Sequence, residues 1–112
     1  MAEQYLIRSE ARIQQGNLAG GIQDLNTIRN RAGLSNFNLT DKNSLLTAVL
    51  HERQVELFTE WGHRWFDLKR TNNATNVLNA VKGAGWQPFD TLYPVPQVEI
   101  QNNGRIVQNA GY

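Results

Sequence analysis

Residues 51–71 read HERQVELFTEWGHRWFDLKRT and hold both histidines of the chain, two of its three tryptophans and a dense set of charges. Apolar residues recur every three or four positions through this region, which predicts an amphipathic helix over Ser44–Trp61. Arg53 falls in the middle of the apolar stripe, and Glu56 follows it at i+3. Because an unpaired buried charge is too costly to keep, we expect carboxylates to surround the Arg53 guanidinium.

Opposite charges recur at the same i, i+3 spacing in the next helical segment. We therefore predict an ion-pair lattice that joins the two segments and is covered by Trp61, Trp65 and Phe66. Such a lattice fixes the register between helices and carries no chemistry of its own. Its predicted members are Glu52, Arg53, Glu56, Arg64, Asp67 and Arg70.

Other chemistries that this stretch suggests lack part of their residue set. His51-Glu52 begins like the zinc motif H-E-x-x-H, but Val55 stands where the second histidine is needed, so we expect no metal. Glu52 and Glu56 lie on one helix turn, whereas the two carboxylates of a glycoside hydrolase face each other across a cleft. A hydrolase would need both exposed in a cleft, and we predict a protein that is not an enzyme and needs no cofactor.

The composition narrows the function further. The 112 residues suffice for one modest domain, 1–112, and the net charge of +1 gives no overall field to attract nucleic acid. The chain has no cysteine, which removes disulfides and thiolate chemistry. No apolar run of about twenty residues is present to span a membrane. The charged opening residues do not form a signal peptide, so we expect either a cytoplasmic protein or an excised piece of a longer one.

Residues 1–33 are predicted to form a hairpin of two helices. Apolar residues recur at helical spacing on both sides of Gly16, Asn17 can cap the second helix, and Gly33 suits a left-handed cap after it. Two helices joined by so short a turn lie antiparallel. The pattern fits a tetratricopeptide repeat about as well as it fits a generic helical hairpin.

After residue 82 the composition changes. Glycines and prolines exclude long helices here, yet residues 82–112 are too apolar to be disordered. We expect this tail to lie as an ordered strap across the helices. The predicted fold class is all-α, with a tetratricopeptide-like helical hairpin over 1–33, further helices over 44–81 and an ordered irregular C-terminal tail over 82–112.

Three stretches, in order, resemble the C-terminal part of the SusD/RagB family. Residues 51–71 resemble the signature E-R-x-x-E-L-x-x-E-G-x-R-x-x-D-L-x-R, with Trp61 inserted before the glycine. Residues 2–34, AEQYLIRSEARIQQGNLAGGIQDLNTIRNRAGL, resemble the family's last tetratricopeptide-like hairpin. Residues 92–112, LYPVPQVEIQNNGRIVQNAGY, resemble its closing tail, with Ala110 in place of the usual proline. The signature falls on Glu52, Arg53, Glu56, Leu57, Glu60, Gly62, Arg64, Asp67, Leu68 and Arg70.

This resemblance implies a non-catalytic, almost wholly helical lipoprotein on the surface of the outer membrane. Such proteins bind oligosaccharides or other nutrients and act as the lid of a TonB-dependent transporter. Full members are several times longer and carry an acylated cysteine. We therefore expect this chain to be a C-terminal scaffold region without the signal and anchor, whose uncovered apolar surface favours self-association. The alternative is a stand-alone tetratricopeptide-like module for protein interactions.

Sugars are bound by flat aromatic faces together with amide and charged hydrogen-bonding groups. Trp86, in the stretch GAGWQPFD, is the candidate aromatic residue, with Gln87, Asn72 and Asn73 as polar helpers. We favour the interpretation that Trp86 packs the tail onto the helices, because large aromatic side chains mostly serve burial.

Overall fold

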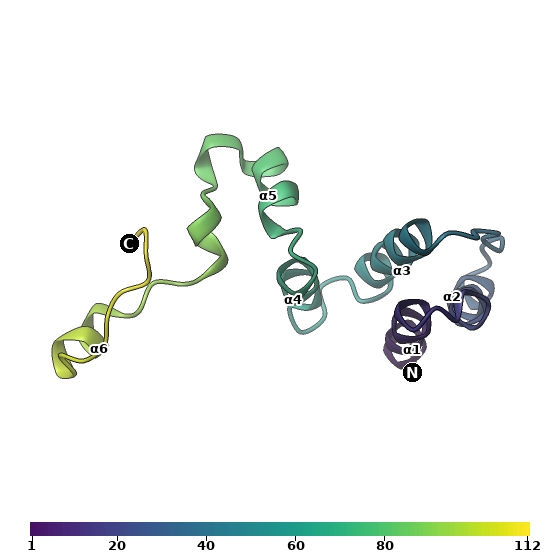
Figure 1. The fold of residues 1–112 in the computed structure, drawn as a ribbon, viewed down its shortest axis with the longest axis horizontal. Helices are drawn as coiled ribbons and strands as arrows, with labels where there is room; N and C mark the ends of the chain where they lie inside the picture. Colours follow the sequence, from purple (N-terminus) through teal and green to yellow (C-terminus); the bar gives the residue numbers. More distant parts are fainter. The chain divides into compact units, whose positions relative to one another are not determined.

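The computed structural model describes all of residues 1–112, and every regular element in it is a helix (Figure 1). This confirms the predicted all-α fold class. The chain forms two compact units, Met1–Arg64 and Trp65–Tyr112, with the division inside the segment predicted to hold the further helices. None of the helices combines the length and the apolar character needed to cross a membrane.

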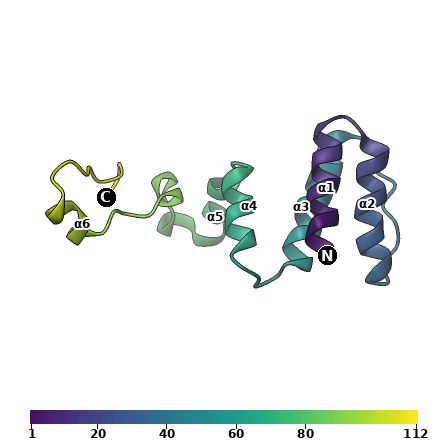
Figure 2. The same cartoon turned by 90° about the horizontal axis from the view of Figure 1, so that it is seen from below.

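Three helices build the N-terminal unit. They are α1 (Ala2–Gln14), α2 (Leu18–Arg31) and α3 (Lys42–Glu56). The first two lie side by side as the predicted hairpin, and α3 packs against both (Figure 2). Asn17 caps α2 as predicted, because its side chain accepts a hydrogen bond from the backbone N–H of Gly20 at 2.9 Å. Gly33 follows α2 with a left-handed φ of 74°, also as predicted.

The core of this unit forms where the apolar faces of α1, α2 and α3 pack against one another. Its buried large side chains are Leu6 and Ile13 of α1, Leu25 and Ile28 of α2, and Leu45 and Val49 of α3.

The two helices of the hairpin approach most closely at Gly21. The Ser9 hydroxyl donates a hydrogen bond to the Gly21 carbonyl oxygen at 2.7 Å, and a Cβ atom on Gly21 would lie 2.4 Å from Cγ1 of Ile13. No side chain larger than hydrogen fits there without a shift of its neighbours.

Helix α3 ends earlier than the sequence predicts. Its last residue is Glu56, and the predicted continuation to Trp61 is wrong. Left-handed backbone at Thr59 (φ 63°), Trp61 (φ 43°) and Gly62 (φ 72°) breaks the helix. The apolar spacing misleads here because Leu57 is buried whereas Trp61 is 88% exposed. The stripe therefore continues in the sequence after the helix has ended.

Shorter elements form the C-terminal unit. They are most of α4 (His63–Arg70), α5 (Ala74–Lys82), the 3₁₀ turns η1 (Gly83–Gly85) and η2 (Pro88–Thr91), and α6 (Gln97–Asn102). The buried residues Leu68, Ala74 and Trp86 make its small core.

The tail within this unit is ordered, as predicted, and folds back on itself. The Gln108 amide accepts from the Val95 N–H at 2.7 Å and donates to the Val95 carbonyl oxygen at 3.0 Å. The Asn109 amide donates to the carbonyl oxygen of Tyr93, and the Tyr112 hydroxyl donates to that of Leu92, each at 2.6 Å. These bonds tie the last residues to the loop before α6.

Candidate functional site

Glu52 of α3 is one of three buried members of the predicted ion-pair lattice, with Arg53 and Asp67. Its carboxylate accepts a hydrogen bond from Nη1 of Arg29 in α2 at 3.0 Å. The Arg29 guanidinium also donates to the Ser35 carbonyl oxygen at 3.0 Å and lies 3.7 Å from the centroid of the Phe37 ring. Sequence reasoning missed Arg29 because spacing rules reveal only partners on the same helix.

The other lattice members lie in different settings. Glu56 pairs with Arg31, a second arginine of α2 that the sequence analysis did not single out. Asp67 accepts from Nε of Arg70 at 2.8 Å, which is the i, i+3 pair predicted within α4. Arg53 is buried, as its place in the apolar stripe predicts.

Arg64 and the aromatic cover differ from the prediction. The Arg64 side chain is exposed, as are Trp61 and Phe66, whereas Trp65 is half-buried. The exposure of Trp61 follows from the turn that ends α3 early. The buried charges are therefore enclosed chiefly by the packing of the helices and not by these aromatic rings. That a single lattice joins the two helical segments stays a prediction.

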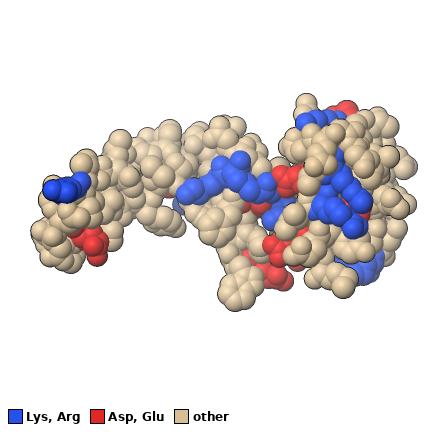
Figure 3. Space-filling model, turned by 60° about the horizontal axis from the view of Figure 1, so that its bottom comes forward, with Lys and Arg blue, Asp and Glu red and all other residues tan.

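A second charge cluster joins α1 to α2. The buried Asp24 carboxylate accepts hydrogen bonds from Nε and Nη2 of Arg8 at 2.9 and 2.8 Å, and from Nη1 of Arg12 at 2.8 Å. The hydrogen bond to Asp24 raises the pKa of the Arg8 guanidinium above its ordinary value. Figure 3 shows basic and acidic atoms side by side on this unit. The signal was available in the sequence as two arginines at i, i+4 on α1.

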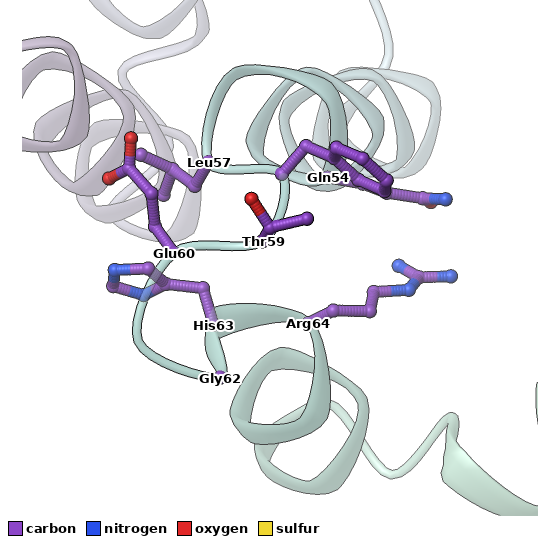
Figure 4. A pocket seen from close by; sticks show the side chains of 8 residues that line it. Gln54, Leu57, Thr59, Glu60, Gly62, His63 and Arg64 are labelled. Carbon is purple, nitrogen blue, oxygen red and sulfur yellow. The ribbon is translucent and has the colours of Figure 1, made fainter.

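A hollow of about 300 Å³ lies at the turn between α3 and α4. Figure 4 shows Glu60 and His63 on one side of it, Gln54 and Arg64 on the other, and Thr59 between them. No hydrogen bond joins a nucleophile to a base here, and nowhere do three histidine or acidic side chains group as metal ligands. Its lining residues are Gln54, Leu57, Phe58, Thr59, Glu60, Gly62, His63 and Arg64.

A hollow of about 350 Å³ in the C-terminal unit is lined largely by aromatic rings, and is called the aromatic hollow below. It contains Trp86, the predicted ligand residue, which is only 6% exposed. The Trp86 ring meets that of Trp65 edge to face with centroids 6.3 Å apart. The lining residues are Trp65, Leu78, Lys82, Trp86, Asp90, Tyr93 and Tyr112.

The three predicted polar helpers are not among the lining residues. Gln87 is exposed, and its backbone N–H donates to Oδ2 of Asp90 at 2.8 Å. Asn72 is exposed with a left-handed φ of 56°, and the Asn73 amide donates to the Thr71 hydroxyl at 3.1 Å.

Comparison with known proteins identifies the class of this helical chain. The model of the SusD family matches residues 1–112, and the chain belongs to this family. The resemblance drawn from the three sequence motifs is thereby confirmed.

Individual relatives cover the chain almost completely. A SusD-like protein, P38, of Formosa agariphila is 31% identical over 120 residues, which cover 99% of this chain and 23% of that protein. The starch-binding protein SusD of Bacteroides thetaiotaomicron is 33% identical over 126 residues, covering 100% of this chain and 20% of that protein. A crystal structure of a SusD-like protein from Bacteroides fragilis superposes with a TM-score of 0.81 at 26% identity, over 99% of this chain and 25% of that one. The chain thus spans about a fifth to a quarter of the proteins it matches.

Proposed function

We propose that this chain is the C-terminal scaffold region of a non-catalytic, glycan-binding protein of the outer membrane. The observation that carries the proposal is the family match over all 112 residues, together with a relative named for binding starch. Because the chain spans only part of those relatives, the proposal concerns a longer protein of which this chain is the helical end.

The burial of acidic side chains in ion pairs between helices supports a scaffold role. Glu52 is enclosed and paired with Arg29, so it is not available in a cleft as a catalytic carboxylate. The carboxylate of Asp24 is likewise enclosed between Arg8 and Arg12. Such pairs fix the register of helices more than they add net stability. A scaffold with fixed register is what a binding protein needs to present its ligand surface.

In this proposal the complete protein is a surface lipoprotein that hands oligosaccharides to a TonB-dependent transporter. The transporter and the lipid anchor follow from the family resemblance.

Isothermal titration of the complete protein against a panel of oligosaccharides tests the proposal. The panel would hold starch, xylan, mannan and alginate fragments. We expect heat of binding for at least one of them and no release of reducing ends during a long incubation. Binding of no member of the panel, or hydrolysis that disappears in Glu56→Gln, would contradict the proposal.

A further inference from the structure

The aromatic hollow has the properties of a site for one sugar ring. A pyranose presents C–H groups on its faces and hydroxyl groups at its edge, so it needs an aromatic surface and hydrogen-bonding groups around it. The hollow brings two tryptophans and two tyrosines together with one amine and one carboxylate. Its volume of about 350 Å³ is at the small end of what ligand pockets hold, which suits a single ring.

We propose that the aromatic hollow binds a neutral pyranose ring, so that this chain itself contributes a glycan contact. The ligand class rests on the proposed function. The location rests on the geometry of the C-terminal unit.

The stacking surface is exposed and held in place. Tyr93 is 76% exposed, and its ring meets that of the half-buried Trp65 edge to face with centroids 6.4 Å apart. The backbone of Tyr93 is fixed by the Asn109 amide, which donates to its carbonyl oxygen at 2.6 Å. A ring that is already positioned loses little conformational freedom when a sugar stacks on it.

Hydrogen-bonding groups complete the wall. Nε1 of the buried Trp86 has no hydrogen-bond partner. This nitrogen is fully enclosed, so Trp86 contributes apolar ring surface to the hollow and the hydrogen-bonding groups come from its neighbours. The Lys82 amine lies 5.5 Å from the centroid of the Trp86 ring, and the carboxylate of Asp90 lines the same hollow. Lys82 can donate to sugar hydroxyls and Asp90 can accept from them.

The charges favour a neutral ligand. The lining holds one cation and one anion, so no net charge attracts an acidic glycan. A neutral hexose polymer therefore fits the hollow better than a sulfated or uronic-acid polymer.

Nuclear magnetic resonance on the 112-residue chain tests the site directly, because its three tryptophans give separate indole N–H signals. The chain is labelled with ¹⁵N and titrated with maltoheptaose, cellohexaose and mannohexaose. We expect the indole signals of Trp65 and Trp86 to shift with one of them, at a dissociation constant on the order of 1 mM for a single-ring site. Trp61 lies outside the hollow and serves as the internal control.

Variants at exposed positions show whether the sugar binds in the aromatic hollow or elsewhere on the chain. Tyr93→Ala removes the stacking ring and should weaken binding roughly five- to tenfold, whereas Tyr93→Phe should keep most of the affinity. Phe66→Ala is the matched control, since Phe66 is also exposed but does not line the hollow. Equal weakening by Tyr93→Ala and Phe66→Ala, or an unchanged affinity in Tyr93→Ala, would overturn the inference.

The two proposals fail in different ways. Binding of a neutral oligosaccharide by the complete protein, with the Trp65 and Trp86 signals unmoved, would leave the proposed function in place and overturn the site. Shifts with none of the three sugars in the chain alone would also overturn it. Shifts at Trp65 and Trp86 in the chain, with no binding by the complete protein, would contradict the proposed function.

Discussion

Arg29 of α2 and Glu52 of α3 form a direct ion pair at 3.0 Å, and their side chains are only 12% and 7% exposed. The two residues lie 23 positions apart in the sequence. Asp24 makes the corresponding link from α2 to α1 through Arg8 and Arg12. The α1–α2 and α2–α3 pairs thus each have an ion pair of defined geometry beside their apolar contact, which restricts how these helices can slide past one another.

Glu52→Gln should destabilise the N-terminal unit strongly. The amide has nearly the shape of the carboxylate but no charge, so the enclosed Arg29 guanidinium loses its counter-ion. Breaking one partner of a buried pair costs about 3 kcal/mol or more. The loss can be measured by urea unfolding of the 112-residue chain, followed by circular dichroism at 222 nm.

Glu56→Gln provides the matched control on the same pair of helices. Its partner Arg31 is 56% exposed, so water can solvate the guanidinium once the carboxylate is gone. Exposed pairs contribute up to about 1 kcal/mol. Equal losses in the two variants would show that enclosure of the Arg29–Glu52 pair does not matter to stability.

Gly21→Ala should lower stability, although alanine favours helices more than glycine does. Propensity alone predicts a gain of about 1 kcal/mol in the interior of a helix. At Gly21, however, the new Cβ would lie 2.4 Å from Cγ1 of Ile13 and 3.1 Å from the Ser9 carbonyl oxygen. Overpacking of this kind costs about 1–3 kcal/mol, so the net change should be a loss.

A calorimetric melting temperature shows whether Gly21→Ala lowers or raises the stability of the chain, and this sign distinguishes overpacking from helix propensity. Gly104→Ala serves as the control, since nothing lies within 4 Å of its Cβ position and its φ is not left-handed. That variant should melt at or slightly above the temperature of the unaltered chain, because alanine restricts the unfolded chain and meets no neighbour in the folded one. A gain in melting temperature for Gly21→Ala would mean that α1 and α2 approach less closely than the structure shows.

Local chemistry could be predicted from the sequence, and contacts across helices could not. The caps at Asn17 and Gly33 depend on neighbouring residues, so they were found. Arg29 and Arg31 were missed as partners of the α3 carboxylates because no spacing rule reaches across more than twenty residues. The aromatic hollow was missed for the same reason, since Tyr93 and Tyr112 come from separate stretches of the tail.

Asp41 gives the N-terminal unit a defined dependence on acid. Its side chain accepts a hydrogen bond from the Ser44 N–H at 2.8 Å at the start of α3, and the interaction with Ser44 holds the pKa of Asp41 below its ordinary 3.8. Because the folded pKa is the lower one, the cap contributes its stability above pH 3.8. That contribution is lost as the pH falls through the folded pKa.

Asp41→Asn isolates this effect, since asparagine also caps helices but does not titrate. Unfolding curves collected between pH 2 and 6 should converge for the two proteins at the acid end and differ above pH 4. The same difference at every pH would show that the charge of Asp41 has no part in the cap.

The ionisation of Tyr112 at alkaline pH should depend on the contacts that hold the C-terminal tail folded back on itself. Partial removal from water raises the pKa of Tyr112 above its ordinary 10.0, and the nearby Asp90 carboxylate raises it further. The neutral hydroxyl donates to the Leu92 carbonyl oxygen at 2.6 Å, a bond that the phenolate cannot make. The folded pKa is the higher one, so the contribution of Tyr112 is complete below pH 10 and is lost as the pH rises through the folded pKa.

Asp90→Asn tests the electrostatic part of this shift. It removes the like charge but leaves the partial desolvation, so the pKa of Tyr112 should move down toward its ordinary value without reaching it. The ¹³C signal of the Tyr112 ring, followed from pH 8 to 12, gives the titration directly. Glu99→Gln changes an exposed charge on α6, which is not among the causes of the shift, and should leave the Tyr112 titration unchanged. If Asp90→Asn also leaves it unchanged, Asp90 does not act on the Tyr112 hydroxyl, and the tail is closed by the Leu92 hydrogen bond and ring packing alone.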